Sequence, residues 1–336
     1  MSKINIMSSM AFDAICYLEQ RLYANNHNNP QGGNFIKKIN DLCGDKLGNS
    51  CVGMSSLCFV LTVYAPNLSF ETLSLDELKF LFNNPEDVRS IVRERVTNEF
   101  LASFIFPLLD DLVVDKARLV QTQLDILKNT GFEQLWRTDL LPGIIKVIEA
   151  KKDIYSNTDL DSALFDIQKL KQNNLQNDIN IYITSLSCGV AFTLANDSFL
   201  EPSGNGGGVW VLLHELMHGF ASDEAVSYYL KYVEGDSYLS EQHKRLLVIS
   251  GNEEEFVAAA EYYLRMKYNN ENKHDLLNHA RRWYDGKMPT SVLLFDLLSQ
   301  EINTPNGYNQ WLIDVFKNNK LPQTNITEHL QKLAPQ

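Results

Sequence analysis

The sequence is poor in basic residues, and this shortage excludes several classes of partner. Lysine and arginine number 30 against 42 aspartates and glutamates, which gives a formal net charge of −12 at pH 7. Binding to the phosphates of nucleic acid requires a basic surface, and no cluster of basic residues in the sequence supplies one. Anionic membrane surfaces are disfavoured for the same reason. We therefore expect neither a nucleic-acid partner nor a membrane partner.

Cysteine is also scarce, and its spacing does not fit a metal site. The chain has five cysteines, an odd number, with no C-x-x-C pair: Cys16, Cys43, Cys51, Cys58 and Cys188. Neither a disulfide framework nor a cysteine-based zinc site is expected in a chain of this size. We interpret the cysteines as small buried residues.

Long apolar runs are absent as well. No window reaches 18 uninterrupted apolar residues, and the first residues lack a basic segment followed by an apolar core. These absences predict a cytoplasmic protein, although export by a route without a cleaved signal would leave the same sequence. The 336 residues, 44% of them hydrophobic, are enough for two globular domains or one large one.

The first half of the chain has a helical period of apolar residues. We expect helices over residues 12–22, 35–42, 54–64, 74–82, 84–106, 121–127, 133–136, 141–150 and 160–170. Polar stretches near residues 151–158 and 172–174 are both possible boundaries, and we place the boundary after residue 172. The predicted domains are then an all-helical N-terminal region of unknown role, residues 1–172, and a second domain, residues 173–336.

Beyond residue 178 the apolar period changes from 3.6 to 2. Residues 179–183 alternate isoleucine with polar residues, and a second alternating run covers residues 190–194 after a glycine-containing turn. We expect these runs to pair as a hairpin in a small sheet, so the fold class is α+β and mostly helical. An edge strand beside a metal site can bind an extended peptide by main-chain hydrogen bonds. Residues 189–196 are the candidate for that role, and an interior strand without ligand contact is the alternative.

The strongest motif is His214-Glu215-Leu216-Met217-His218, an H-E-x-x-H pattern that follows the apolar residues 209–213 and a glycine-rich breaker at 204–208. Residues four apart lie on one face of a helix, so both imidazoles can reach one Zn²⁺ ion. Glu215 projects beside the metal, where its carboxylate can accept a proton from a zinc-bound water. The motif predicts Zn²⁺ as the cofactor, His214 and His218 as ligands, and Glu215 as the catalytic base.

A catalytic zinc site has three protein ligands, so one more must be found. Glu224 stands where an H-E-x-x-H-x-x-G-x-x-H pattern has its third ligand, but Ala221 replaces the glycine that the sharp turn of this pattern requires. Residues 222–224 also look like the capped start of a new helix, in which Glu224 would interact with the helix dipole. Glu224 is therefore the weaker candidate.

The other candidates are the consecutive glutamates Glu253, Glu254 and Glu255. Ser250 and Glu253 fit a capping box, which would occupy Glu253. Glu255 shares a helical face with small residues that would allow close approach to the H-E-x-x-H helix, and Glu254 points about 100° away from that face. We predict Glu255 as the third metal ligand and keep Glu254 as the alternative.

These residues resemble the gluzincins, zinc peptidases in which H-E-x-x-H is followed several helical turns later by a helix-borne Glu. Residues 252–258, N-E-E-E-F-V-A, are similar to the corresponding helix of the lethal-factor-like toxin protease domains, where an acidic residue directly before Phe binds the metal. The matching position is Glu255. The resemblance covers about residues 214–263 and implies that residues 173–336 form a zincin-like metallopeptidase domain. The tyrosine that these toxin domains place before the glutamate helix is missing from residues 246–249, and no Asp stands four residues after Glu255.

The predicted function is zinc-dependent hydrolysis of peptide bonds in a peptide or protein substrate. The donor for the oxyanion stays open among Tyr228, Tyr229, Tyr232, Tyr262, Tyr263, His274, His279 and Tyr284. A competing hypothesis is a non-hydrolytic helical binding or regulatory protein that retains a zincin-like metal site. The intact Glu215 argues against it, because a structural zinc site does not need that carboxylate.

Overall fold

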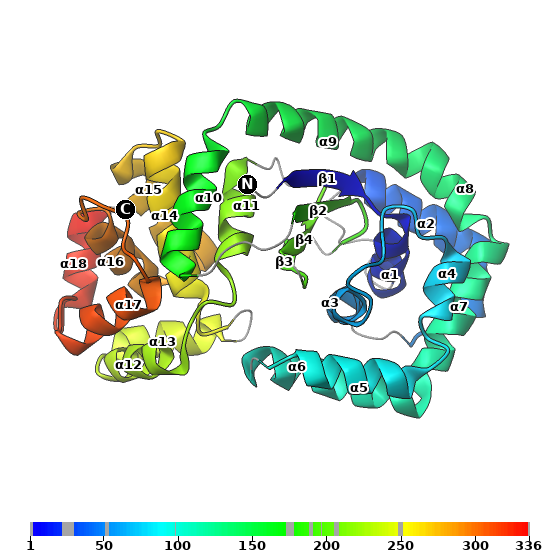
Figure 1. Cartoon of the computed structure of the whole chain (residues 1–336), viewed down its shortest axis with the longest axis horizontal. Coiled ribbons are helices and arrows are strands. Elements are labelled where there is room, and N and C mark those ends of the chain that lie inside the picture. The colour runs from blue at the N-terminus through cyan, green and yellow to red at the C-terminus, as the bar shows by residue number, and fades with distance from the viewer. Residues whose placement is uncertain are drawn as a thin grey trace. The chain divides into compact units, whose positions relative to one another are not determined.

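The chain divides into two structural units (Figure 1). The computed structural model describes residues 3–21, 30–50, 54–97, 99–172, 178–187, 191–195, 197–204, 208–247 and 251–334. The N-terminal unit consists of Ser2–Ile154 and Gln176–Gly208, and the C-terminal unit consists of Tyr155–Leu175 and Val209–Gln336. These units do not follow the predicted boundary after residue 172, because the strands beyond residue 178 join the sheet of the N-terminal unit.

That sheet has the strand order β1-β2-β4-β3. The strands are β1 (Ile4–Ser8), β2 (Ile179–Thr184), β3 (Phe192–Thr193) and β4 (Ser198–Pro202). β1 and β4 run parallel to β2, and β3 runs antiparallel to β4. Two Ile-Asn-Ile segments, residues 4–6 and 179–181, lie opposite each other in the β1–β2 pair. The shared alternation places their apolar side chains on one face, which fixes the register.

The predicted hairpin between residues 179–183 and 190–194 is wrong. β4 lies between β2 and β3, so the antiparallel pair is β3 with β4. β2 is buried along nearly its whole length, as is typical of a central strand in a parallel sheet. β3 is the last strand in the order, as the predicted peptide-binding role requires. Parts of the predicted segment 189–196 lie outside the described residues, and the role stays a prediction.

Among the described residues, every segment predicted to be helical overlaps at least one helix. In the N-terminal unit they are α1 (Met10–Gln20), α2 (Pro30–Cys43), η2 (Gly44–Leu47), α3 (Met54–Tyr64), α4 (Leu75–Phe80), α5 (Pro85–Arg95), α6 (Glu99–Asp111), η3 (Leu112–Lys116), α7 (Ala117–Asn129), α8 (Phe132–Leu135), η4 (Trp136–Leu140) and α9 (Leu141–Ser156). The single helix predicted over residues 84–106 is two helices, because Val96 adopts an extended backbone conformation after α5.

A fully buried carboxylate, Asp13, links three parts of the N-terminal unit. It lies on α1 and accepts hydrogen bonds from the backbone N–H groups of Ser185 (2.9 Å) and Leu186 (3.0 Å), just after β2. Its other oxygen accepts from Nε1 of Trp136 on η4 (2.8 Å). Burial raises the pKa of Asp13 to about 7, and the three donors oppose this shift.

The C-terminal unit is helical in its described residues. It contains α10 (Leu160–Lys171), α11 (Val209–Met217), α12 (Asp223–Glu234), α13 (Ser237–Leu246), α14 (Glu254–Tyr268), α15 (Lys273–Arg282), η5 (Trp283–Gly286), α16 (Pro289–Leu298), α17 (Tyr308–Lys317) and α18 (Ile326–Leu333).

Helix α14 is the central helix of this unit. It packs against α10, α11, α15 and α16, and every residue from Glu254 to Leu264 is buried. Its apolar residues face all directions, which is typical of a helix covered on every side. Three glutamates lie within this buried stretch, namely Glu254, Glu255 and Glu261, and each therefore needs a compensating partner.

The structure is mostly helical with one small sheet, which confirms the α+β class. Across the described residues, no helix combines the length and the apolar character needed to cross a bilayer.

The buried Asp13 leads to a prediction about pH and stability. Its raised pKa means that the folded protein keeps this proton between about pH 4 and 7, whereas the unfolded chain loses it. Asp13 therefore contributes stability that is fully present below about pH 4 and is lost progressively until the pH reaches about 7. Between pH 5 and pH 8 the unfolding free energy of the wild type should fall by a few kcal/mol, at ~1.4 kcal/mol per pKa unit. Asp13→Asn should not show this loss.

Urea unfolding of both proteins at the two pH values measures this difference, and the comparison cancels the other titrating groups. If the stability difference between the wild type and Asp13→Asn is instead the same at pH 5 and pH 8, the three N–H donors keep the carboxylate ionised throughout and the expectation is wrong.

Candidate metal centre

Helix α11 carries the first four residues of the H-E-x-x-H motif, which was predicted to lie on a helix. It begins at Val209 and ends at Met217, and apart from His214 and Glu215 all its residues are apolar. His218 follows the last helical residue in a turn, with its N–H bonded to the carbonyl of Glu215. The two imidazole rings lie edge to face with centroids 5.0 Å apart. Both rings therefore lie on one side of α11.

Groups from outside the helix fix the end of α11. Nζ of Lys171, on α10, donates to the carbonyls of Leu216 (2.8 Å) and His218 (2.9 Å), which lack helical partners at a C-terminus. Gly219 has φ of +72°, a left-handed conformation that favours glycine. These features turn the chain away directly after His218 and hold the second histidine in place.

His214, His218 and Glu254 form a group that could hold a metal ion. One ligand atom from each lies within 4.8 Å of the others. Nε2 of His214 is 3.3 Å from Oε1 of Glu254, and Nε2 of His218 is 3.9 Å from Oε2 of Glu254. Glu254 is 4% exposed. Within the described ranges no other cluster of this kind is found.

Two further carboxylates, one for each histidine, contact the ring nitrogens that do not face Glu254. Nδ1 of His214 lies 3.0 Å from Oε2 of Glu261, and Nδ1 of His218 lies 3.0 Å from Oε1 of Glu253. A carboxylate is an acceptor, so each Nδ1 carries the hydrogen and each Nε2 is left to face Glu254. Histidines that bind metals are usually held in this way.

The electrostatics of the site follow from this arrangement. Burial lowers the pKa of His214, but Glu254 and Glu261 outweigh it and raise the pKa well above its usual range. Burial likewise opposes a raised pKa at His218, where Glu253 contributes most to the increase. Burial also opposes the lowered pKa of Glu253, which results chiefly from its contact with His218. The carboxylates thus favour positive charge at this point, as a metal site requires.

The donor set fits a divalent transition metal. Two imidazole nitrogens with one carboxylate oxygen are the three protein ligands of a common catalytic zinc site, which keeps a fourth position open. A metal ion would also compensate the negative charge of Glu254, because burying a charged carboxylate without a partner is costly. His214, His218 and Glu254 are the residues that would hold it.

The predicted third ligand, Glu255, is not in this group. Its carboxylate faces the other way and accepts from the Tyr229 hydroxyl (2.7 Å) and from the Thr290 N–H (2.8 Å). Burial raises the pKa of Glu255 to about 7, against the effect of these donors. The face that Glu255 shares with Tyr262 packs on α15 and α16, where Tyr262 contacts His279 and Phe295. The alternative, Glu254, is therefore the glutamate beside the histidines.

Two other expectations about glutamates have clear outcomes. Ser222 caps α12 by accepting from the Ala225 N–H, and Glu224 is exposed in the first turn, which confirms Glu224 as a helix-terminal residue. The capping role predicted for Glu253 is wrong: its carboxylate accepts from His218 and from the N–H of Gly219 (3.0 Å). Glu253 is the residue just before α14, so it lies too early to be the third residue of that helix. Its predicted partner, Ser250, lies outside the described residues.

Sequence reasoning missed Glu261 and assigned Glu253 to a different role. A signal for Glu261 existed, because Glu261 and Arg265 follow Glu254 by seven and eleven residues, a spacing that puts all three on one face of the helix. No comparable local signal marks Glu253, because its partners, His218 and Gly219, precede it in the sequence by 35 and 34 residues.

Most of the candidates for the oxyanion donor are committed elsewhere. The hydroxyls of four tyrosines contact other groups: Tyr229 contacts Glu255, Tyr232 contacts the Pro322 carbonyl, Tyr262 contacts His279, and Tyr263 contacts Thr304. Nε2 of His274 contacts Asn278. The side chain of Tyr284 lies outside the described residues. The structure brings none of these five described side chains into the metal-ligand group.

Comparison of the chain with protein-family models, with curated proteins and with solved structures finds no match. The assignment of a function therefore depends on the residues of the site.

The choice between the adjacent glutamates can be tested with matched variants. Glu254→Gln should weaken zinc binding by more than about 100-fold, the upper end for residues outside the ligand set, because it removes a charged ligand. Glu255→Gln makes the same chemical change one residue away and should bind zinc as the wild type does. Competition with a chelator measures both affinities. Loss of zinc in Glu255→Gln together with retention in Glu254→Gln would reverse the assignment.

Proposed function

We propose that this protein is a zinc-dependent metallopeptidase of the gluzincin type, with a zincin-like catalytic site. One observation carries the proposal: the Nε2 atoms of His214 and His218 converge on the Glu254 carboxylate while both Nδ1 atoms are held by carboxylates. This is the ligand set and the outer support expected of a catalytic zinc site. An H-E-x-x-H motif also supplies a base, Glu215, that a structural metal site would not need.

Zn²⁺ held by these three groups supplies a Lewis acid that polarises a peptide carbonyl and lowers the pKa of water. Glu215 is buried, and its negative charge helps to raise the pKa of His218. In this role Glu215 accepts the proton of the attacking water and donates it to the leaving amine.

The position of Glu254 refines the resemblance on which the proposal partly relies. A glutamate carried by a later helix is the gluzincin pattern, and Glu254 on α14 meets it. The match to the lethal-factor-like toxin domains assigned the metal to the acidic residue directly before Phe256, whereas the glutamate beside the histidines stands one residue earlier. We therefore propose the gluzincin ligand set without a closer family.

Replacing Glu215 separates metal binding from catalysis. The purified wild type should contain one zinc per chain and cleave members of a peptide library. Glu215→Gln should keep the zinc and lose about 10²- to 10⁴-fold in kcat, the usual contribution of a general acid–base group. Metal analysis and cleavage assays on both proteins provide the test. Cleavage by Glu215→Gln at the wild-type rate would refute the mechanism, and zinc binding without any cleavage by the wild type would favour the non-hydrolytic alternative.

A further inference from the structure

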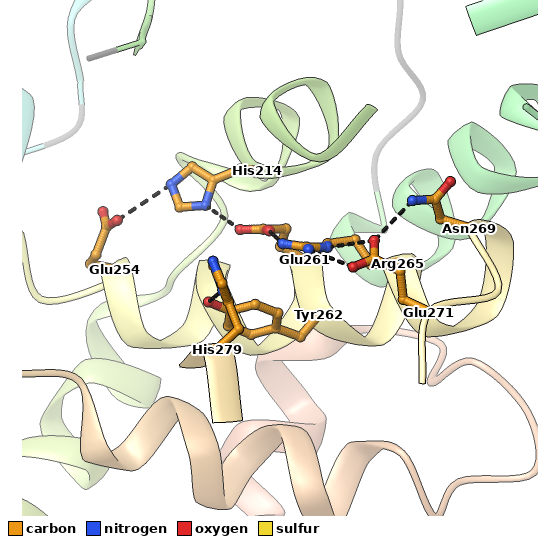
Figure 2. Close-up of polar contacts among 8 residues, drawn as sticks. All are labelled: His214, Glu254, Glu261, Tyr262, Arg265, Asn269, Glu271 and His279. Carbon is orange, nitrogen blue, oxygen red and sulfur yellow. Dashed lines mark hydrogen bonds and ion pairs between the residues drawn. The ribbon is translucent and has the colours of Figure 1, made fainter. Parts of the chain in front are cut away.

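A chain of ion pairs runs from His214 along α14 toward its C-terminal end (Figure 2). Oε2 of Glu261 contacts Nδ1 of His214, and Oε1 of the same carboxylate accepts from Nη1 of Arg265 (2.9 Å). Nε and Nη2 of Arg265 donate to the two oxygens of Glu271 (2.9 and 2.6 Å). Asn269 donates to Glu271 in turn (2.8 Å). Each member of the chain thus fixes the orientation of the one before it.

Arg265 can hold Glu261 because its own position is determined on several sides. It lies one helical turn after Glu261, and its side chain is 12% exposed against 7% for Glu261. Its guanidinium lies over the ring of Tyr262, 5.5 Å from the centroid, and that tyrosine contacts His279. A planar guanidinium binds Glu271 through two parallel hydrogen bonds and still has donors for Glu261. An ammonium group has no such fork.

The two carboxylate oxygens of Glu261 have different partners, and through them Arg265 affects the orientation of His214. Because Oε1 is bound to Arg265, Oε2 is the oxygen that faces Nδ1 of His214. That contact keeps the hydrogen on Nδ1 and orients the ring so that Nε2 faces Glu254. The partner of the second histidine, Glu253, is fixed differently, by the backbone N–H of Gly219. The two histidines therefore depend on separate supports.

We propose that Arg265, held by Glu271, is a positioning residue for the metal centre and acts on His214 through Glu261. This inference rests on the metal site of the proposed function and does not require peptidase activity. Arg265 itself contacts neither a metal ligand nor substrate in this role.

The test uses a variant that keeps the positive charge. In Arg265→Lys the single ammonium group cannot form two parallel hydrogen bonds to Glu271 and also bind Glu261. Zinc affinity should therefore fall about 10-fold, which is the smaller of the losses typical for residues that support metal ligands. Arg282→Lys is the matched control, because Arg282 is exposed and donates to a carbonyl of its own helix. It should bind zinc as the wild type does. Chelator competition measures the affinities. The visible absorption of the Co²⁺-loaded protein should change in Arg265→Lys alone.

A double-mutant cycle decides whether Arg265 acts through Glu261. In a Glu261→Gln background, Arg265→Lys should change zinc affinity by about twofold or less, because the carboxylate that it orients is gone. Unchanged zinc affinity in the single variant, or the same loss in both backgrounds, would overturn the proposal. His214→Ala distinguishes this failure from failure of the site: if it binds zinc normally, the metal centre itself is wrong.

Discussion

The burial of carboxylates between α11 and α14 is the constraint on which the site depends. Glu254 and Glu261 lie within a helix that is covered on every side, and an ionised carboxylate in such a place is costly without a partner of opposite charge. The imidazoles of His214 and His218 and the guanidinium of Arg265 supply that compensation. A metal ion at Glu254 would add to it. Glu254, Glu261 and Arg265 of α14 and the H-E-x-x-H motif are therefore a single electrostatic unit.

The rest of the C-terminal unit fixes the two helices in place. Lys171 on α10 donates hydrogen bonds to the carbonyls at the end of α11. Glu253, the residue just before α14, binds His218 and the N–H of Gly219, and so connects the end of α11 to the start of α14. On the far side of α14, Glu255 accepts hydrogen bonds from Tyr229 on α12 and from the first turn of α16. These contacts determine how α14 is rotated about its axis. That rotation places Glu254 toward the histidines.

In the N-terminal unit, too, a buried carboxylate holds separate elements together. Asp13 connects α1 to the segment after β2 and to Trp136, so residues distant in the sequence depend on one buried group. The sheet also joins distant segments, since β1 from the N-terminus pairs with β2. For this reason neither structural unit is a single continuous segment of the chain.

The sequence by itself determined the local features of this protein. The helices and the placement of His214, Glu215 and His218 within five consecutive residues, at the end of α11, depend on residues within a few positions of each other. The alternation that marks β2 was also visible in the sequence, whereas β1 and its pairing with β2 were not predicted. Only the tertiary structure decided which glutamate joins the histidines. Glu254 and Glu255 are neighbours with equal chemistry, and the choice between them is a rotation of about 100° set by packing on all sides of α14.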